Sequence, residues 1–189
     1  MEIRKLDHIA LYMRRRDTAA TFLTSHLGFH IVDHTDRYTL VGAGGRLGKL
    51  TLFDAPEGTS PAPGAIERIN VRVADPESAA DRLSPELAVE QRDGGYIFSG
   101  PEGLRFALVS GEGNFTDYDL EGLILRSEAP EESARHFVSM GFAPGEDATT
   151  GDQATSAHAR NHRVHAHRSR FRTPAYVGGP VAFGQNVRS

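Results

Sequence analysis

The chain repeats one short segment three times. Leu6–Leu11 (Leu-Asp-His-Ile-Ala-Leu) returns as Ile66–Val71 (Ile-Glu-Arg-Ile-Asn-Val) and again as Leu120–Leu125 (Leu-Glu-Gly-Leu-Ile-Leu). The first two copies alternate polar and apolar residues, which is typical of a half-buried strand, and every copy is followed by a polar break and a helix-like stretch. A chain of this kind is expected to fold as several copies of one supersecondary unit.

The first copy predicts a strand, a helix and three further strands. Asp17 is a suitable helix N-cap, and Gly28 is expected to end the helix in a left-handed conformation. The Gly-rich turn at 42–45 lies between two strands and is therefore read as a hairpin turn and not as a phosphate cradle. The predicted strands are 6–12, 29–32, 38–41 and 49–53, and the predicted helix is 18–27.

The second copy predicts the same order of elements after a Pro/Gly-rich linker at 54–64. Asp75 followed by Pro76 indicates a helix start, because proline is favoured at the first helical position. Both units therefore read β-α-β-β-β. The predicted elements are a strand at 66–73, a short helix at 78–83, and strands near 88–92, 96–99 and 105–109.

The third copy predicts a strand and a helix at 131–138, and then the pattern stops. Residues 151–189 hold six Arg and one acidic residue, Asp152, against a net charge of -4 for the whole chain. Without apolar periodicity, this basic His/Arg-rich tail is expected to be irregular, and a changed reading frame near residue 150 is one hypothesis for its origin. His158 and His162 have the spacing of a helical metal pair, but the missing periodicity argues against a helix.

Composition excludes several classes of protein. Cysteine is absent, which removes disulfides, thiolate metal sites and cysteine nucleophiles. No apolar run approaches the roughly 20 residues that a membrane span needs. No secretory signal is recognised at the N-terminus, so a cytoplasmic location is expected. The Arg14–Arg16 run is read as a solvated loop, and nucleic acid is not expected as a partner.

At this point the chain resembles the vicinal oxygen chelate superfamily, which includes glyoxalases, bleomycin resistance proteins and extradiol dioxygenases. The resemblance lies in Leu6–Leu11, in Phe22–Phe29 at the helix exit, and in Gly100–Val109 at the last turn and strand. It implies an α+β fold in which paired βαβββ modules form a curled eight-stranded sheet around a cleft. The predicted modules are 1–54 and 65–112, with a partial third module at 118–148 and the tail at 149–189.

The resemblance also implies where metal ligands would lie, on the first and last strands of each module. Carried over by position, these residues are His8, Thr51, Arg68 and Ala107. A zinc site needs at least three protein ligands, and a non-haem iron site needs about two His and a carboxylate. A guanidinium at one of these positions repels a divalent cation. No metal is therefore expected, and a divalent metal held at His8 remains the alternative.

The predicted function is the binding of a small, anionic organic ligand in a metal-free cleft. Arg68 offers a planar fork for a carboxylate, phosphate or enolate, and His8 offers a hydrogen-bond partner or general base. These two residues are the candidate catalytic pair, although whether the protein is an enzyme stays open. The predicted ligand-binding residues are Tyr12, Thr51, Arg68, Asn70 and Ala107.

Three alternatives remain beside this reading. The first is a metal-dependent lyase or ring-cleaving dioxygenase that uses His8. The second is a non-catalytic interaction protein whose cleft is degenerate. The third is structural: His8 is a satisfied core histidine, and Arg68 pairs with a local acid. The third module's exposed strand and the apolar face of its helix also predict a homodimer.

Overall fold

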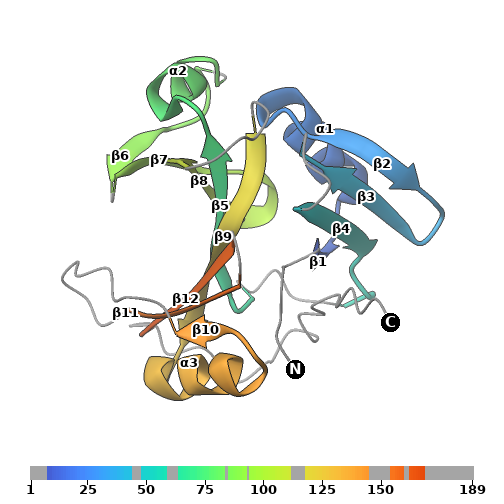
Figure 1. Cartoon of the computed structure of the whole chain (residues 1–189). Coiled ribbons are helices and arrows are strands. Elements are labelled where there is room, and N and C mark those ends of the chain that lie inside the picture. Colours follow the sequence, from blue (N-terminus) through green and yellow to red (C-terminus); the bar gives the residue numbers. More distant parts are fainter. Residues whose placement is uncertain are drawn as a thin grey trace.

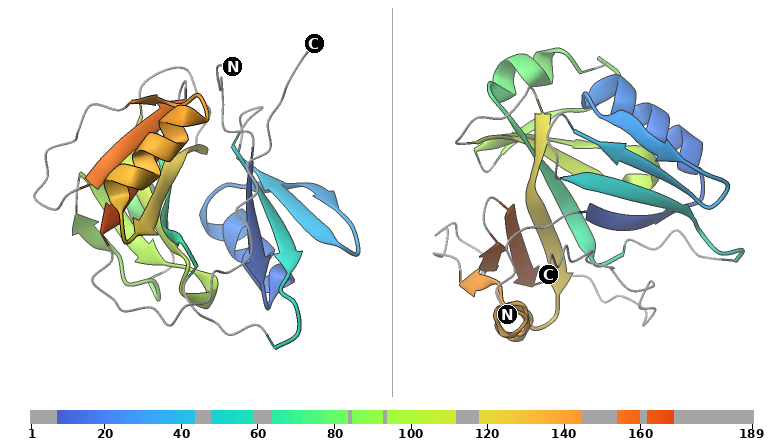
Figure 2. Two further views of the ribbon diagram at one scale, coloured as in Figure 1. Left: turned by 90° about the horizontal axis from the view of Figure 1, so that it is seen from below. Right: turned by 45° about the vertical axis from the view of Figure 1, so that its right-hand side comes forward.

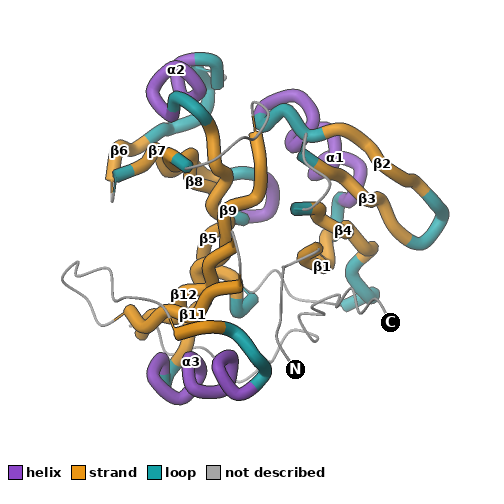
Figure 3. Tube along the Cα trace, in the orientation of Figure 1, coloured by secondary structure: helices purple, strands orange, loops and turns teal. Residues whose placement is uncertain are grey.

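The strands form two sheets, one of four strands and one of eight (Figure 1). This computed structural model describes residues 8–43, 48–58, 64–83, 85–92, 94–111, 118–144, 154–159 and 162–168, the last two ranges and 143–144 as backbone alone. Short helices accompany the strands (Figure 3), which gives the α+β class predicted from the sequence. Among the described residues, no helix is both long and apolar enough to cross a membrane.

The first module forms the four-stranded sheet, in the order β1-β4-β3-β2. Alternation along β1 buries Ile9, Leu11 and Met13, while Tyr12 is exposed on the other face. Gly28 ends α1 with a φ of 63°, as expected for a left-handed helix terminus. The elements are β1 (His8–Met13), α1 (Arg16–His26), β2 (His30–His34), β3 (Tyr38–Gly42) and β4 (Lys49–Asp54).

The second module repeats this topology, in the order β5-β8-β7-β6. Asp75 caps α2 as predicted, and Pro76 is at its start. Hydrogen bonds from the Ser78 hydroxyl and backbone N–H lower the pKa of the Asp75 carboxyl. The elements are β5 (Ile66–Val73), α2 (Pro76–Asp81), β6 (Glu90–Arg92), β7 (Gly95–Ser99), the 3-10 turn η1 (Pro101–Gly103) and β8 (Arg105–Ser110).

The third module continues into three further strands, so the expectations of a partial module and of an irregular tail are wrong for the residues of these strands, 143–144, 154–159 and 162–168. β12 pairs in parallel with β9, just as β4 pairs with β1. Val164 is the only large apolar residue in 154–168, so these strands depend on pairing with β9 more than on their own pattern. The elements are β9 (Tyr118–Ser127), α3 (Pro130–Ser139), β10 (Ala143–Pro144), β11 (Ala154–Ala159) and β12 (His162–Arg168).

The eight-stranded sheet joins the second and third modules, in the order β10-β11-β12-β9-β5-β8-β7-β6. The expectation that the first two modules share this sheet is wrong, because β9 pairs antiparallel with the edge of β5. Figure 2 shows the first module's strands as a separate sheet beside it. The three copies have similar strand patterns, so alternation alone does not determine which copies pair.

The two sheets meet through their core faces at α1. The Phe22 ring lies 6.5 Å from that of Phe98 and 6.0 Å from that of Phe106, measured between centroids. Phe98 and Phe106 are buried on β7 and β8. A single hydrophobic cluster therefore includes residues from all three modules.

The start of α1 differs from the sequence prediction. The helix begins at Arg16, so Asp17 lies in its first turn, and the residue at the N-cap, Arg15, makes no side-chain cap bond. Instead, Glu102 of η1 accepts hydrogen bonds from the backbone N–H groups of Arg14 at 3.0 Å and Arg15 at 2.8 Å. The second module thus supplies a carboxylate to the first module's helix, whose N-terminus attracts negative charge.

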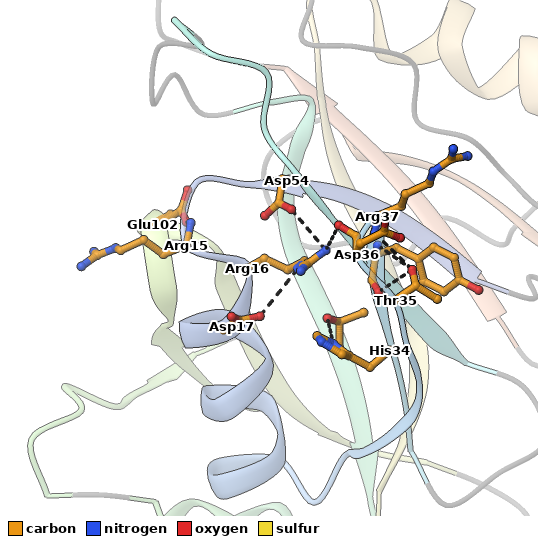
Figure 4. A network of polar contacts seen from close by, with 11 residues as sticks. Arg15, Arg16, Asp17, His34, Thr35, Asp36, Arg37, Asp54 and Glu102 are labelled. Carbon is orange, nitrogen blue, oxygen red and sulfur yellow. Dashed lines mark hydrogen bonds and ion pairs between the residues drawn. The ribbon is translucent and has the colours of Figure 1, made fainter.

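The Arg14–Arg16 run is only partly solvated, so the reading of a simple surface loop is wrong for Arg16. Its side chain is 11% exposed and pairs with Asp54 at 3.2 Å and with Asp17 at 3.6 Å. It also donates to the carbonyl of Asp36 at 3.3 Å, in the turn between β2 and β3 (Figure 4). This arginine therefore joins the start of α1 to the end of β4 and to the turn after β2.

Candidate functional site

Arg68 and Asn70 are hydrogen bonded to each other on β5, in the middle of the eight-stranded sheet. The Arg68 Nε donates to the Asn70 Oδ1 at 3.0 Å, and both residues are half-buried. Ile69 and Val71, which alternate with them, are fully buried in the core. We call the opposite face, which carries Arg68, Asn70 and Arg72, the open face of this sheet.

Small residues flank Asn70 on both neighbouring strands. Ala107 of β8 and Gly122 of β9 are its register partners. Beyond Ala107 the row continues with Ile97 of β7. Ala107 and Ile97 are buried. The Asn70 amide is therefore flanked only by the methyl group of Ala107 and by Gly122, which has no side chain.

Further basic residues occupy the rows of Arg68 and Asn70. Arg105 is the register partner of Arg68 on β8. On β12, Arg163 is at the register position opposite Gly122, and His165 is opposite Ile124. Residues at these register positions of β12 were not expected from the sequence, because their segment was predicted to be an irregular tail. Arg105 was detectable, since it is two residues before Ala107 on the same predicted strand.

At the other end of the open face, Arg72 is buried in an ion-pair cluster with two acids of β9. Its Nη2 lies 2.6 Å from the Asp119 Oδ2, and its Nη1 lies 3.5 Å from the Glu121 Oε2. The Arg72 side chain is 9% exposed. A Cβ built on Gly111 would come within 1.7 Å of the Arg72 Cδ, so only glycine leaves room for this arginine there. These contacts tie the second module to the third.

The predicted first-module residues lie on the other sheet. Thr51 of β4 is buried and pairs with Ala10, two residues after His8 on β1. Tyr12 is 51% exposed, and its ring centroid lies 5.7 Å from that of Phe53. The structure therefore brings Arg68, Asn70 and Ala107 together on one sheet, and His8, Tyr12 and Thr51 on another.

The Tyr12–Phe53 contact extends into a row of three aromatic residues across β1, β4 and β3. Phe53 is the register partner of both Tyr12 and Tyr38, and the ring of Tyr38 lies 6.0 Å from that of Phe53. The Tyr38 hydroxyl donates to the Asp33 Oδ2 at 2.6 Å. This bond, together with the nearby negative charge, raises the pKa of Tyr38.

The donors at the four positions carried over from the family do not fit a divalent metal. His8 is the only metal-ligating side chain among them, Arg68 is cationic, and Ala107 has no donor. Across the described ranges, no group of three or more His, Asp or Glu residues lies close enough to hold a metal ion. We therefore assign no step of any mechanism to a metal here.

A cavity of about 660 Å³ lies beside α3, and neither Arg68 nor Asn70 lines it. Its basic residues are Arg126, Arg135 and His136. Arg126 also donates to the Gly64 carbonyl at 3.1 Å and lies 3.8 Å from the Glu67 carboxylate. The volume falls within the range of small-molecule sites, but none of the residues that line this cavity was predicted to be functional from the sequence.

Comparison with known proteins identifies the family. The family model described as "Glyoxalase/Bleomycin resistance protein/Dioxygenase superfamily" matches residues 5–173, and the chain therefore belongs to this superfamily. No curated protein matches the chain.

Solved structures of longer proteins share the fold. A putative dioxygenase from Bacillus subtilis is 17% identical with a TM-score of 0.69, over 88% of this chain and 64% of that one. A glyoxalase I variant from Zea mays is 14% identical with a TM-score of 0.68, over 90% and 69%. This chain therefore spans about two thirds of the length of each. At these identities the likeness concerns the fold alone.

Proposed function

We propose that this protein binds a small organic anion on the open face of its eight-stranded sheet, without a metal. The single observation that carries the proposal is the hydrogen-bonded Arg68–Asn70 pair, with Ala107 and Gly122 in register on either side of Asn70. Arg68 contacts the anionic group, Asn70 orients the guanidinium, and Ala107 forms part of the floor.

Charge and burial support an anion over a neutral ligand. A half-buried guanidinium interacts with a carboxylate or phosphate more strongly than a fully exposed one, because water screens it less. Arg105 adds a second positive charge in the same row. Arg72 is already matched by Asp119 and Glu121, so it contributes structure and not ligand charge. Ile97 and Ala107 are apolar and buried, so the floor beneath the proposed ligand carries no competing charge.

The first-module residues take no part in this site as we propose it. His8, Tyr12 and Thr51 belong to the four-stranded sheet, and we assign them no contact with the ligand. A binding role needs only shape and charge on the open face. Two alternatives remain as outcomes of the experiment that follows. One is a metal-dependent lyase or dioxygenase that uses His8, and the other is an interaction protein that binds no small ligand.

The test is a thermal-shift screen with matched ligands. A library of small organic carboxylates is compared with the corresponding neutral amides, because a ligand that binds the folded state raises its melting temperature. We expect acids and not amides to raise the melting temperature. For the best acid, Arg68→Ala should weaken binding by about 1.5–3 kcal/mol, roughly 10- to 150-fold in Kd, because a charge-assisted hydrogen bond is lost.

Two control variants locate the ligand. Arg37→Ala removes the same charge from an exposed position in the first module and should leave Kd unchanged. Arg135→Ala removes an arginine from the cavity beside α3 and should also leave Kd unchanged. Binding that is lost in Arg135→Ala but kept in Arg68→Ala would move the site to that cavity. A screen without acid-specific shifts, or with shifts abolished by a chelator, would reject the proposal.

A further inference from the structure

A second arginine lies directly beside Arg68 on the open face. Arg105 of β8 is the register partner of Arg68 in a parallel pair, and Ser99 of β7 is the register partner of Arg105. Register partners on neighbouring strands extend from the same face of a sheet, and the strands lie about 4.8 Å apart. Two guanidinium groups and a hydroxyl group therefore follow one another across three adjacent strands.

This arrangement of like charges is unfavourable unless another group balances it. Like charges directly opposite each other on neighbouring strands destabilise a sheet. Both arginines are half-buried, so water screens their repulsion less than it would at full exposure. Among the residues that the structure describes, no acid forms a hydrogen bond or ion pair with Arg105. Arg72 of the same face, by contrast, is matched by Asp119 and Glu121.

The charge and the geometry of the two arginines fit a doubly charged tetrahedral oxyanion. A phosphomonoester carries close to two negative charges above its second pKa of about 6, and its three terminal oxygens accept strong hydrogen bonds. Each guanidinium can bind two such oxygens, so two guanidiniums can hold one phosphoryl group from two sides. A single carboxylate is planar and carries one charge, so it balances only one of the two arginines.

We propose that the organic anion of the open face is a phosphomonoester, whose phosphoryl group is held by Arg68 and Arg105 together. This inference rests on the ligand site proposed above and narrows its ligand to one chemical class. Ser99 donates a hydrogen bond to the same group from the next strand. Ile124, the register partner of Arg68 on β9, contacts the organic part of the ester. Carboxylates bind at the same place more weakly, because one positive charge stays unbalanced.

Phenyl phosphate and phenyl sulfate are the probes, because they have nearly the same shape and differ by one negative charge at about pH 7.5. Isothermal titration calorimetry on the full chain gives Kd for each. We expect phenyl phosphate to bind about tenfold more tightly than phenyl sulfate, through one further charge-assisted hydrogen-bonded pair. Arg68→Gln should weaken the binding of both esters.

Variants of Arg105 test where this preference arises. Arg105→Gln should reduce the preference for phenyl phosphate to less than about twofold, whereas Arg105→Lys keeps the positive charge and should retain most of it. Arg37→Gln removes an exposed arginine of the first module and should change neither Kd. Without ligand, Arg105→Gln should melt at the same temperature as the parent or higher, because it removes a like-charge contact. A structural role in an ion pair would instead lower the melting temperature.

The outcomes separate this inference from the function on which it rests. Equal Kd values for the two esters in the parent, or a preference that survives Arg105→Gln, would overturn the phosphomonoester assignment. If both esters then still lose affinity in Arg68→Gln, the organic-anion site stands and only the doubly charged ligand is rejected. If neither ester and none of the carboxylates binds, the proposed function fails as well.

Discussion

Glu102 takes the role at the start of α1 that the sequence predicted for Asp17, because its carboxylate accepts the backbone hydrogen bonds there. It is the one non-glycine residue with a positive φ, 55°, among the described residues. Its side chain is 12% exposed and accepts backbone hydrogen bonds from Arg14 and Arg15. A strained backbone at η1 is therefore offset by a contact that holds α1 against the second module.

Substitutions at Glu102 should separate these two effects. Glu102→Ala is expected to lower the free energy of unfolding by about 1–3 kcal/mol, because two hydrogen bonds to a charged acceptor are lost. Glu102→Gly loses the same bonds but relieves the positive φ, so it should be the more stable of the two variants. Urea denaturation measures both, with exposed Glu57→Ala as the control. Equal stability of Glu102→Ala and the parent would contradict this role.

Strand alternation explains which of the site residues could be placed from the sequence. Strand alternation correctly placed Arg68, Asn70 and Ala107 on one face, because β5 and β8 have their own clear patterns. The same reasoning grouped His8 and Thr51 correctly with each other. It could not decide whether the two groups share a sheet, since that depends on which strand edges meet.

Among the elements, β9 contributes most to the arrangement of the molecule. It lies between β5 and β12 in the eight-stranded sheet, and Tyr118 and Leu120 near its start lie close to Gly28 and Gly48 of the first module. A Cβ built on Gly28 would come within 2.6 Å of the Tyr118 ring, so glycine at this helix end allows β9 to approach. Asp119, the next residue, forms the closest ion pair with Arg72. The partner of β5 is thus fixed by packing as well as by backbone pairing.

Removing the Asp119 carboxylate should destabilise the junction of the second and third modules. Asp119→Ala removes the closest ion-pair partner of the buried Arg72 guanidinium, and we expect a loss of about 3 kcal/mol in unfolding free energy. Asp119→Asn keeps a hydrogen-bond acceptor and should lose less. Asp81→Ala, an exposed acid on α2, serves as the control. Chemical denaturation that gives equal values for Asp119→Ala and Asp81→Ala would rule out this contribution.

Strands with weak patterns were the elements that sequence analysis could not find. The segments of β11 and β12 contain mostly Ala, Ser, Thr, His and Arg, with Val164 as the single large apolar residue. Their pairing depends on the available edge of β9, which is a tertiary property. By contrast, β5 was predicted with its observed bounds. Its alternation is strong, the Pro/Gly-rich linker at 54–64 precedes it, and Asp75-Pro76 follows it.

At the scale of the whole molecule, three similar modules use their strand edges in two different ways. The second and third modules join through β5 and β9, and the first contacts them through α1 and the rings of Phe22, Phe98 and Phe106. The open face with Arg68 and the first module's face with Thr51 therefore belong to different sheets. We assign ligand binding to the former.

Arginine side-chain NMR tests the ligand claim most directly. The ¹⁵N–H resonance of the Arg68 Nε is assigned by its absence in Arg68→Ala, and the best organic acid from the screen is titrated into the ¹⁵N-labelled protein. We predict a saturable shift of the Arg68 resonance, with backbone amide shifts centred on Asn70, Ala107 and Gly122. Saturable shifts centred on β1 and β4, or beside α3, with the Arg68 resonance unmoved, would contradict the account.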